Sequence, residues 1–316
     1  MGKILTITLN PSIDKSIMVA ALIPDQKLRC YATKFEAGGG GINVARAIKR
    51  LGGEPTAWFL AGGYFGDFLT ALIKKKELLY RTFKIKNETR ESTILFDEAN
   101  QNQYLLNADG PEIAQKEWHS LLNAVNKVND VAYIVASGSL PLGVPVDFFG
   151  QLAKIAKKKG VKFILDTSGE ALKIAINEGV YLFKPNLREM GLLVGIDKID
   201  IEIAKEKALE MLKTKNCEAI VVSLGADGAL LVSKDIVEHI PAPPAENKST
   251  VGAGDSMVAG IVLSLSNGKT LQEAVRYGVA CGVAATLNAG STLCKKEDAD
   301  ALYAVIENEM KNSVFK

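Results

Sequence analysis

The segment 249–260 carries a glycine-rich turn followed by a single acid, a combination suited to phosphoryl transfer. Gly252-Ala253-Gly254 leads directly into Asp255, and the apolar, small-residue run 257–265 after it is typical of a buried helix. The first turn of a helix presents free backbone N–H groups and the positive end of the helix dipole. Such a turn holds an anion, and an acid beside it is placed to take a proton from a hydroxyl that attacks the anion.

A second glycine-rich segment, Gly38-Gly39-Gly40-Gly41, precedes Ile42 and Asn43 and opens a helical pattern that ends at Gly52-Gly53. Successive glycines let the backbone approach a ligand closely, and the Asn43 amide can both donate to and accept from hydroxyl groups. A flexible loop leading into a helix is the alternative. We favour ligand binding, because ordering four glycines has a large entropic cost that a plain connection does not require.

Two familiar nucleotide motifs are absent from the sequence. No Gly-x-x-x-x-Gly-Lys-[Ser/Thr] segment occurs, which excludes a P-loop. Gly252-Ala253-Gly254 begins like a dinucleotide fingerprint, but Met257 stands where the third glycine belongs, which argues against NAD and a dehydrogenase.

Asn186 and Glu189 place an amide and an acid three residues apart at the start of a predicted helix. The pair could help to hold a hydrated Mg²⁺ ion. It also fits a capping box, and on the residues alone we favour the cap. Arg29 and Arg90 are weaker candidates for binding a phosphate through their guanidinium groups, whereas Trp58 and Trp118 lie in apolar patterns typical of a core.

The elements that must position these residues alternate between apolar strands and helices, which predicts a parallel sheet covered on both faces. Polar loops follow five of the strands. Because ligands bind beyond the carboxyl ends of parallel strands, we expect the loops to line one trough. The predicted strands are Ile4–Leu9, Thr56–Leu60, Arg81–Ile85, Val131–Ala136, Lys162–Leu165, Tyr181–Phe183 and Ala219–Val222, with an antiparallel edge from Ala229–Val232 and Val237–Ile240. The loops are Asn10–Asp14, Ser137–Ser139, Asp166–Ser168, Lys184–Asn186 and Ser223–Gly225.

Shorter strand patterns predict a separate small sheet, built from Ile17–Ala20, Leu28–Phe35 and a hairpin of Glu91–Phe96 with Gln103–Leu106. We therefore expect one α/β domain over residues 1–316, with a discontinuous β lid from about 15–36 and 89–108. The alternation predicts exposed apolar positions on this lid that need a cover: Ile17, Val19, Ile94 and Leu95.

Composition narrows the class of protein. The chain has 316 residues and a net charge of +2 without a basic block, so we expect no nucleic-acid partner. Its four scattered cysteines and two histidines argue against a zinc site and against histidine-based catalysis. No signal peptide or membrane-length apolar run is present, so we expect a soluble, cytoplasmic protein with no membrane partner.

Gly39–Ala45 and Ser249–Ser256 together resemble the two signatures of the ribokinase-like (PfkB) sugar kinases, and the resemblance covers essentially the whole chain. It implies a three-layer α/β/α fold with a mostly parallel central sheet and a small β-sheet lid. Further similar stretches point to the hexose-phosphate branch: Lys27–Cys30, 38–48, Ser137–Pro141, Asp166–Leu172 and 284–288. The implied activity is transfer from Mg-ATP to the 1-hydroxyl of fructose 6-phosphate, with a tagatose-6-phosphate kinase or a 1-phosphofructokinase as alternatives.

The resemblance also implies a role for each matching position. Asp255 would be the base, with the N–H groups of Gly252, Ala253 and Gly254 as an anion hole. The sugar phosphate would contact Asp14, Gly38, Gly39, Gly40, Gly41, Asn43, Arg90 and Ser139, with assistance from Lys27 and Arg29. ATP would contact Lys184, Asn186, Ser223, Gly225 and Gly228, and Glu189 would organise Mg²⁺. K⁺ would lie among Ser249, Val251, Ala285, Asn288, Gly290 and Thr292, mostly through main-chain groups.

Members of this family clasp two lids in a dimer, so we expect a homodimer here. One segment departs from the family pattern: Asn107-Ala108-Asp109-Gly110 stands where close relatives carry Met-Pro-Gly, which leaves the substrate preference open. A binding protein without catalysis is a further alternative, and Asp255 with its glycine turn argues against it.

Overall fold

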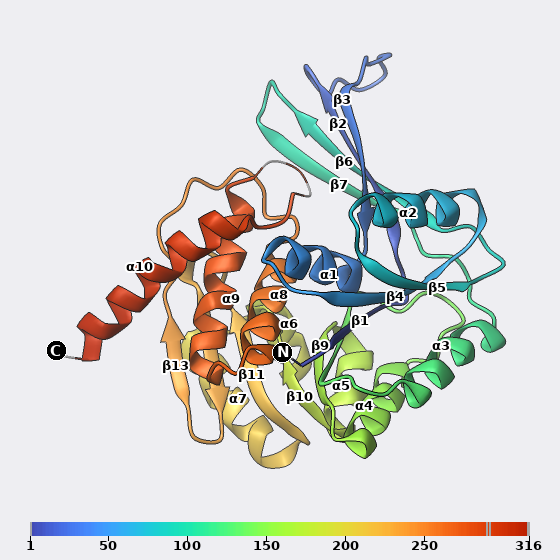
Figure 1. Ribbon diagram of the computed structural model, residues 1–316. Coiled ribbons are helices and arrows are strands. Elements are labelled where there is room, and N and C mark those ends of the chain that lie inside the picture. Colours follow the sequence, from blue (N-terminus) through green and yellow to red (C-terminus); the bar gives the residue numbers. More distant parts are fainter. Residues whose placement is uncertain (1, 289, 291, 315–316) are drawn as a thin grey trace.

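The computed structural model describes residues 2–288, 290 and 292–314 and contains two sheets of different size (Figure 1). The larger sheet has nine strands in the order β13-β12-β11-β10-β9-β8-β1-β4-β5. Its strands are β1 (Ile4–Thr8), β4 (Pro55–Ala61), β5 (Leu79–Lys84), β8 (Tyr133–Ser137), β9 (Lys162–Asp166), β10 (Val180–Phe183), β11 (Cys217–Ser223), β12 (Ala229–Ser233) and β13 (Val237–Ile240).

Neighbouring strands of this sheet pair in parallel, except that β12 is antiparallel to both β11 and β13 at one edge. This confirms the mostly parallel sheet and the predicted edge hairpin. Alternate residues along one strand serve opposite faces: Ile134 and Ala136 of β8 join one apolar cluster, and Tyr133 and Val135 join the other. The sheet is therefore buried on both sides, which explains why its strands read as continuous apolar runs.

Helices cover both faces and form the outer layers of the fold. One cluster packs α1 (Gly40–Arg50), α8 (Ala253–Ser266), α9 (Leu271–Thr286) and α10 (Lys296–Val314) on the sheet. The other packs α3 (Gln115–Lys127), α4 (Phe148–Lys159), α5 (Gly169–Glu178), α6 (Leu187–Val194) and α7 (Ile201–Thr214). Helix α2 (Gly63–Lys75) joins a third cluster with Ile13 and Ala37 of the small sheet. Among the described residues, no helix is long and apolar enough to cross a membrane.

The smaller sheet, called the lid below, consists of β2 (Ser12–Val19), β3 (Tyr31–Gly38), β6 (Arg90–Asp97) and β7 (Asn102–Asn107), in the order β3-β2-β6-β7. It projects from the α/β body in Figure 1. Strands β6 and β7 pair in antiparallel register, as the predicted hairpin requires, and β2 pairs with β6 in parallel.

Three expectations about the lid region need correction. Asp14 lies within β2 rather than in a loop, and helix α1 begins at Gly40, inside the glycine run. Val19 and Ile94 are buried rather than exposed, with 1% and 5% of their surface accessible. Ile17 and Leu95, on the same two strands, are half-buried. Ile94 and Leu95 are consecutive on β6 and therefore point to opposite faces of the lid. The large exposed apolar side chains instead belong to the outer strands and the β2–β3 connection: Leu22, Ile23, Tyr31, Phe35, Tyr104, Leu105 and Leu106.

Candidate active site

Five polar loops meet at one edge of the large sheet. They follow β1, β8, β9, β10 and β11, which are consecutive neighbours and run parallel. Their carboxyl ends therefore face the same way, as predicted. Helix α8 begins beside this edge, because Ser137 at the end of β8 lies within 3.4 Å of the Asp255 carboxylate.

Asp255 lies in the first turn of α8 and is held by two donors from distant parts of the chain. Asn43 Nδ2 donates to Asp255 Oδ2 at 3.0 Å, and Ser137 Oγ donates to Oδ1 at 3.4 Å. Burial, with repulsion from Asp166, raises the pKa of Asp255 to about 7 against the opposing effect of these donors and of Lys184. A carboxyl group with such a pKa can take a proton near neutral pH.

Lys184 supplies a buried positive charge next to this acid. Its Nζ lies 3.3 Å from Asp166 Oδ1, and a side chain on Gly254 would meet the same Nζ at 3.3 Å. Burial opposes the charge of Lys184, but attraction from Asp166, with further contributions from Asp255 and Glu189, raises its pKa. The ammonium group therefore stays charged at the start of α8, where an incoming phosphoryl group would carry negative charge.

The glycine turn provides the expected open donors, with one exception. Gly252 caps the helix in the left-handed region at φ 77°. The Ala253 N–H donates to the Thr250 carbonyl at 3.3 Å. The N–H groups of Gly252 and Gly254 find no acceptor in the described part of the chain and so are available to an anion.

The glycines of 38–41 are packed against protein rather than held open for a ligand alone. A Cβ on Gly38 would lie 2.2 Å from both carboxylate oxygens of Asp14, and one on Gly40 would lie 2.2 Å from Ser137 Oγ. Gly39 has φ 101° and precedes α1 as its cap. Glycine at 38 and 40 therefore brings two polar groups of the trough close to the backbone, a reason that the entropic argument from sequence did not include.

The other residues expected to contact the sugar phosphate lie around Asn10. Arg90 donates from its guanidinium to the carbonyls of Asn10 at 3.3 Å and Ala108 at 3.0 Å, and Asn10 Nδ2 donates to Ser139 Oγ at 3.0 Å. Asp14 is buried, accepts from Ser12 Oγ at 2.6 Å, and has a pKa that burial raises above its usual range. The structure thus brings Asp14, Arg90 and Ser139 together.

Lys27 and Arg29 are not brought to this group within one chain. Both are exposed in the connection that follows Val19 and precedes Tyr31. Asp14 lies nearer the opposite end of the β2–β3 ladder, because it pairs with Glu36 whereas Met18 pairs with Tyr31.

A groove on the other side of the α8 N-terminus contains part of the predicted nucleotide site. Ser223, Gly225 and Gly228 line it together with Ala253 and Gly254. Lys184 and Asn186 lie at the end of β10 rather than in this lining. Sequence reasoning missed the apolar wall of the groove, for which the only signal was the Pro243-Pro244 pair after the edge hairpin. That wall comprises Ala226, Ala242, Pro243, Pro244, Ala245, Met257, Val279 and Val283.

Asn186 and Glu189 form the capping box that the sequence favoured. Asn186 Oδ1 accepts from the Glu189 N–H at 2.8 Å, and Glu189 Oε2 accepts from the Asn186 N–H at 2.9 Å. The described residues contain no group of three or more His, Cys, Asp or Glu side chains that could hold a metal ion. The residues present therefore suit a Mg²⁺ ion carried largely by nucleotide phosphates and water, with Glu189 at its periphery.

The predicted K⁺ positions gather at the C-terminus of α9 and in the approach to α8. Ser249 Oγ donates to the Gly290 carbonyl at 2.9 Å, Asn288 follows the end of α9, and the Ser249 N–H lies 3.4 Å from the Thr286 carbonyl. Thr292 faces the lid instead, where Lys34 Nζ lies 3.4 Å from its Oγ1. The C-terminal end of a helix carries partial negative charge and favours a cation, so the oxygen atoms gathered at the end of α9 fit K⁺.

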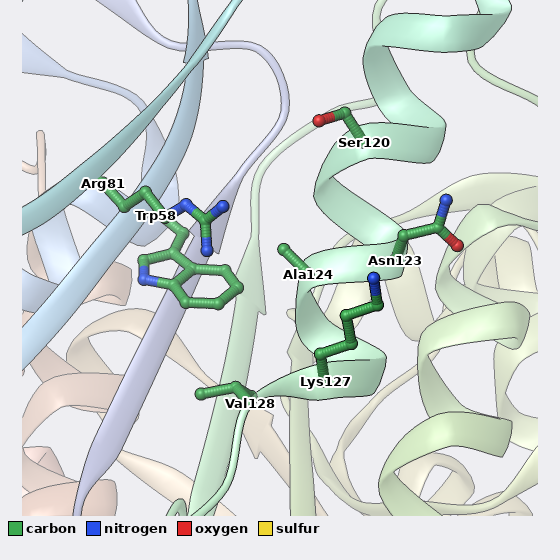
Figure 2. Close-up of a pocket in the computed structure, with 7 residues that line it drawn as sticks. All are labelled: Trp58, Arg81, Ser120, Asn123, Ala124, Lys127 and Val128. Carbon is green, nitrogen blue, oxygen red and sulfur yellow. The ribbon is translucent and has the colours of Figure 1, made fainter.

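A separate pocket lies between α3 and strands β4 and β5, away from these groups (Figure 2). The Arg81 guanidinium lies over the Trp58 indole, 5.1 Å from its centroid. Lys127 of α3 also lines this pocket. Trp58 and Trp118 are buried, as predicted, although Trp58 also forms the wall of this pocket.

Comparison with known proteins places this geometry in a family. The family model described as "pfkB family carbohydrate kinase" matches residues 7–298. The chain is 41% identical to the Escherichia coli (strain K12) ATP-dependent 6-phosphofructokinase isozyme 2 over 97% of this chain and 99% of that protein. It is 32% identical to a Borreliella burgdorferi 1-phosphofructokinase over 97% and 98% of the two chains.

Solved structures of related enzymes have the same fold as this chain. Escherichia coli phosphofructokinase-2 in complex with potassium superposes with a TM-score of 0.93 at 40% identity, over 97% of this chain and all (100%) of that one. The same enzyme in complex with fructose 6-phosphate gives 0.92 at 39% identity, over 97% and 100%. The three-layer ribokinase-like fold with a lid is therefore established, and this chain is a member of the pfkB family of carbohydrate kinases.

Proposed function

We propose that this protein is an ATP-dependent 6-phosphofructokinase, which transfers the γ-phosphate of ATP to the 1-hydroxyl of fructose 6-phosphate. One observation carries the proposal: the N-terminus of α8 is shared by two sites. Gly254 lines the nucleotide groove, and the next residue, Asp255, contacts Asn43 and Ser137 in the trough. A phosphate entering from the groove and a hydroxyl entering from the trough would meet at this turn.

The residues of the turn divide the chemistry between them. Asp255 takes the proton of the 1-hydroxyl as its oxygen attacks the γ-phosphorus, and the bond from that phosphorus to the oxygen bridging it to the β-phosphate breaks, so that ADP leaves. The open N–H groups of Gly252 and Gly254, with the Lys184 ammonium nearby, stabilise the negative charge on the transferring group. Mg²⁺ bound to the ATP phosphates would neutralise part of their charge, with Glu189 and Asn186 placed to hold its water. The apolar groove wall around Val279 and Val283 suits an adenine ring.

The acceptor side is assigned in the same way. Asp14 and Asn43, with the backbone of Gly39 and Gly40, hold the sugar hydroxyls, and Arg90 and Ser139 lie toward the sugar phosphate. Support comes from the relatives, since the Escherichia coli enzyme has been solved with fructose 6-phosphate and with potassium. K⁺ between α9 and Ser249 would stabilise the turn that precedes Gly252.

A specific observation keeps a second candidate in view. Arg90 donates to the carbonyl of Ala108, which lies in the segment 107–110 that departs from the pattern of close relatives. A change in this segment would re-aim the guanidinium that meets the sugar phosphate. Tagatose-6-phosphate kinase and 1-phosphofructokinase are therefore the alternatives.

The test is the rate of ADP release with each sugar phosphate offered separately. We expect the highest kcat/KM with fructose 6-phosphate, lower values with tagatose 6-phosphate and fructose 1-phosphate, and little release without a sugar phosphate. If fructose 6-phosphate gives the lowest kcat/KM of the three, the proposed substrate is wrong while the kinase chemistry stands. If no sugar phosphate raises ADP release, the proposed kinase activity itself is wrong.

We also propose that residues 1–316 form one kinase domain that dimerises through the discontinuous lid. The apolar side chains on its outer strands support this, because Leu105 and Leu106 expose 50% and 57% of their surface in one chain. An exposed apolar edge of this kind is normally covered by a partner. Sedimentation of the purified protein at micromolar concentration should give a dimer, and a monomer would contradict the proposal.

A further inference from the structure

Arg46 is a buried arginine that contacts Asn43, the residue that donates to the candidate base Asp255. Arg46 lies on α1, whose residues from Gly41 to Ile48 are all buried, and only 8% of its surface is accessible. Its guanidinium donates to the Ala37 carbonyl at 2.5 Å, to Asn43 Oδ1 at 3.1 Å and to Glu36 Oε1 at 2.7 Å. A buried guanidinium with three such acceptors is held in one orientation.

The contact with Asn43 determines which end of the amide faces the base. The Asn43 oxygen accepts from Arg46, so the Asn43 amino group is the end that donates to Asp255 Oδ2, at 3.0 Å. Turning the amide over would place its oxygen against the Asp255 carboxylate and its amino group against the guanidinium. Both new contacts would be repulsive, which means that Arg46 selects the orientation in which Asn43 supports a charged Asp255.

Glu36 fixes the arginine from the side of the lid. It lies on β3, is itself 9% exposed, and faces Asp14 across the β2–β3 ladder. Because a buried cation needs a partner, Glu36 holds Arg46 at this depth. A chain of contacts thus runs from lid strand β3 through Arg46 and Asn43 to Asp255. The other charged groups that act on Asp255 are Asp166 and Lys184, and those that act on Arg46 are Asp14 and Arg50, while Lys34 pairs with the second oxygen of Glu36.

We propose that Arg46, anchored by Glu36, is a positioning residue that orients the Asn43 amide and thereby sets the acidity of Asp255. The proposal rests on the function assigned above only in naming Asp255 as the base. It predicts that loss of the guanidinium fork weakens the donor to Asp255 even when the positive charge is kept, because Arg46 reaches Asn43 and Glu36 with two separate nitrogens and a lysine has only one.

The variant that tests this is Arg46→Lys, which keeps the charge and removes the fork. The measurement is the titration of Asp255 by ¹³C NMR of protein labelled at the aspartate side-chain carboxyl, with the Asp255 signal assigned as the one that Asp255→Asn removes. We expect the midpoint to rise by about one pH unit, as loss of a hydrogen bond to a charged group would cause. The midpoint of the pH–kcat curve should rise with it. An unchanged midpoint in folded Arg46→Lys protein would overturn the proposal.

Asn43→Ala keeps the test decisive if Arg46→Lys does not fold, because it removes the amide directly. Its midpoint should rise as well, and the double variant should show no further rise, since Arg46 acts through Asn43. A wild-type midpoint in Asn43→Ala, or shifts that add in the double variant, would refute the proposed route.

Arg276→Lys is the matched control. This arginine pairs with Glu238 and Glu307 on the outer side of α9, so the same substitution there should leave the Asp255 midpoint unchanged. A shift of equal size in this control would assign the effect to general loosening of the protein and would also count against the proposal. The NMR midpoint does not depend on the substrate, so a wrong assignment of the sugar phosphate and a wrong role for Arg46 give different results.

Discussion

Two parts of the molecule differ in how many contacts one chain gives to the side chains proposed for function. One is the floor of the trough, formed by Asp255, Lys184 and Asn43, and the other is the distal lid, which is the β2–β3 connection with Lys27 and Arg29. On the floor, Asp255, Lys184 and Asn43 each have hydrogen-bond or ion-pair partners at 3.0–3.4 Å that come from other elements. In the distal lid, Lys27 and Arg29 are exposed and have no hydrogen-bond or ion-pair partner in the described part of the chain. The groups proposed to carry the chemical step are therefore held in place within one chain, whereas Lys27 and Arg29 are left exposed.

The largest expected effect comes from removing the base on the floor. Asp255→Asn keeps the shape of the side chain but cannot accept the hydroxyl proton, so kcat should fall about 10³-fold. Fructose 6-phosphate binding, measured by calorimetry, should change only a few-fold. Asp67→Asn, at an exposed position of α2, is the control and should retain full turnover. Unchanged kcat in Asp255→Asn would remove this residue from its role.

The same variant should be more stable than the wild type at pH 8. Folding raises the pKa of Asp255 from 3.8 to about 7, so between these values the folded chain binds more protons than the unfolded chain. The unfolding free energy contributed by this group therefore falls as pH rises toward 7 and stays low above it. A neutral side chain removes that loss, and urea unfolding of Asp255→Asn and the wild type at pH 5 and pH 8 would show it. A lower stability of the variant at pH 8 would contradict the raised pKa.

Breaking the ion pair of the floor should have the next largest effect. Lys184→Met leaves Asp166 partly buried without its cation and removes a positive charge near the transferring phosphate. We expect kcat to fall about 10- to 100-fold. The pH–kcat curve should also move to higher pH, because Lys184 lowers the pKa of Asp255. Lys154→Met, on α4, breaks a more exposed ion pair with Glu178 of α5 and should leave both quantities unchanged.

Between pH 8 and pH 6 the wild-type kcat/KM should fall about tenfold, because kcat/KM follows the ionisation of the free enzyme. The base is the ionised form of Asp255, and a pKa of about 7 leaves roughly one carboxyl in eleven ionised at pH 6. Measuring kcat/KM at intervals of half a pH unit would locate the midpoint. A flat profile over this range would show that Asp255 has its ordinary acidity or is not the base.

The lid should respond differently from the floor. Leu105→Asp places a charge on the outer strand β7 and should weaken the proposed dimer, with a several-fold rise in KM for the sugar phosphate and a smaller change in kcat. Val237→Asp, on the outer strand of the large sheet, is a matched control because it is also exposed. If Leu105→Asp stays dimeric with unchanged KM, the distinction between floor and lid is wrong for this edge.

The parts that could be predicted from sequence depend on local pattern. Apolar runs separated by helices predicted the sheet, the edge hairpin and the alignment of five polar loops, because strand period and loop position are local properties. The capping box of Asn186 and Glu189 is local as well. Contacts between distant residues cannot be predicted from local pattern. Asn43 and Asp255 are 212 positions apart, and the residues around Asn43 do not indicate that Asp255 is its partner.

Two other outcomes depended on tertiary context. Val19 and Ile94 are buried whereas Ile17 and Leu95, on the same two strands, are half-buried, and alternation along a strand does not tell which of these side chains the rest of the chain covers. Arg46 was not singled out from the sequence, yet it is buried on α1 and pairs with Glu36 of β3 at 2.7 Å. Charged residues in otherwise buried helical runs are the signal that could have pointed to it.

In the proposed function, Asp255, Lys184 and Asn43 direct the 1-hydroxyl of fructose 6-phosphate onto the γ-phosphate of ATP. The position of the new phosphate ester tests this most directly, by ³¹P and ¹³C NMR of the product formed from fructose 6-phosphate labelled with ¹³C at C1. We predict carbon–phosphorus coupling at C1 and one ADP for each ester formed. A new ester at any carbon other than C1, or ADP release without a sugar bisphosphate, would contradict the proposed function.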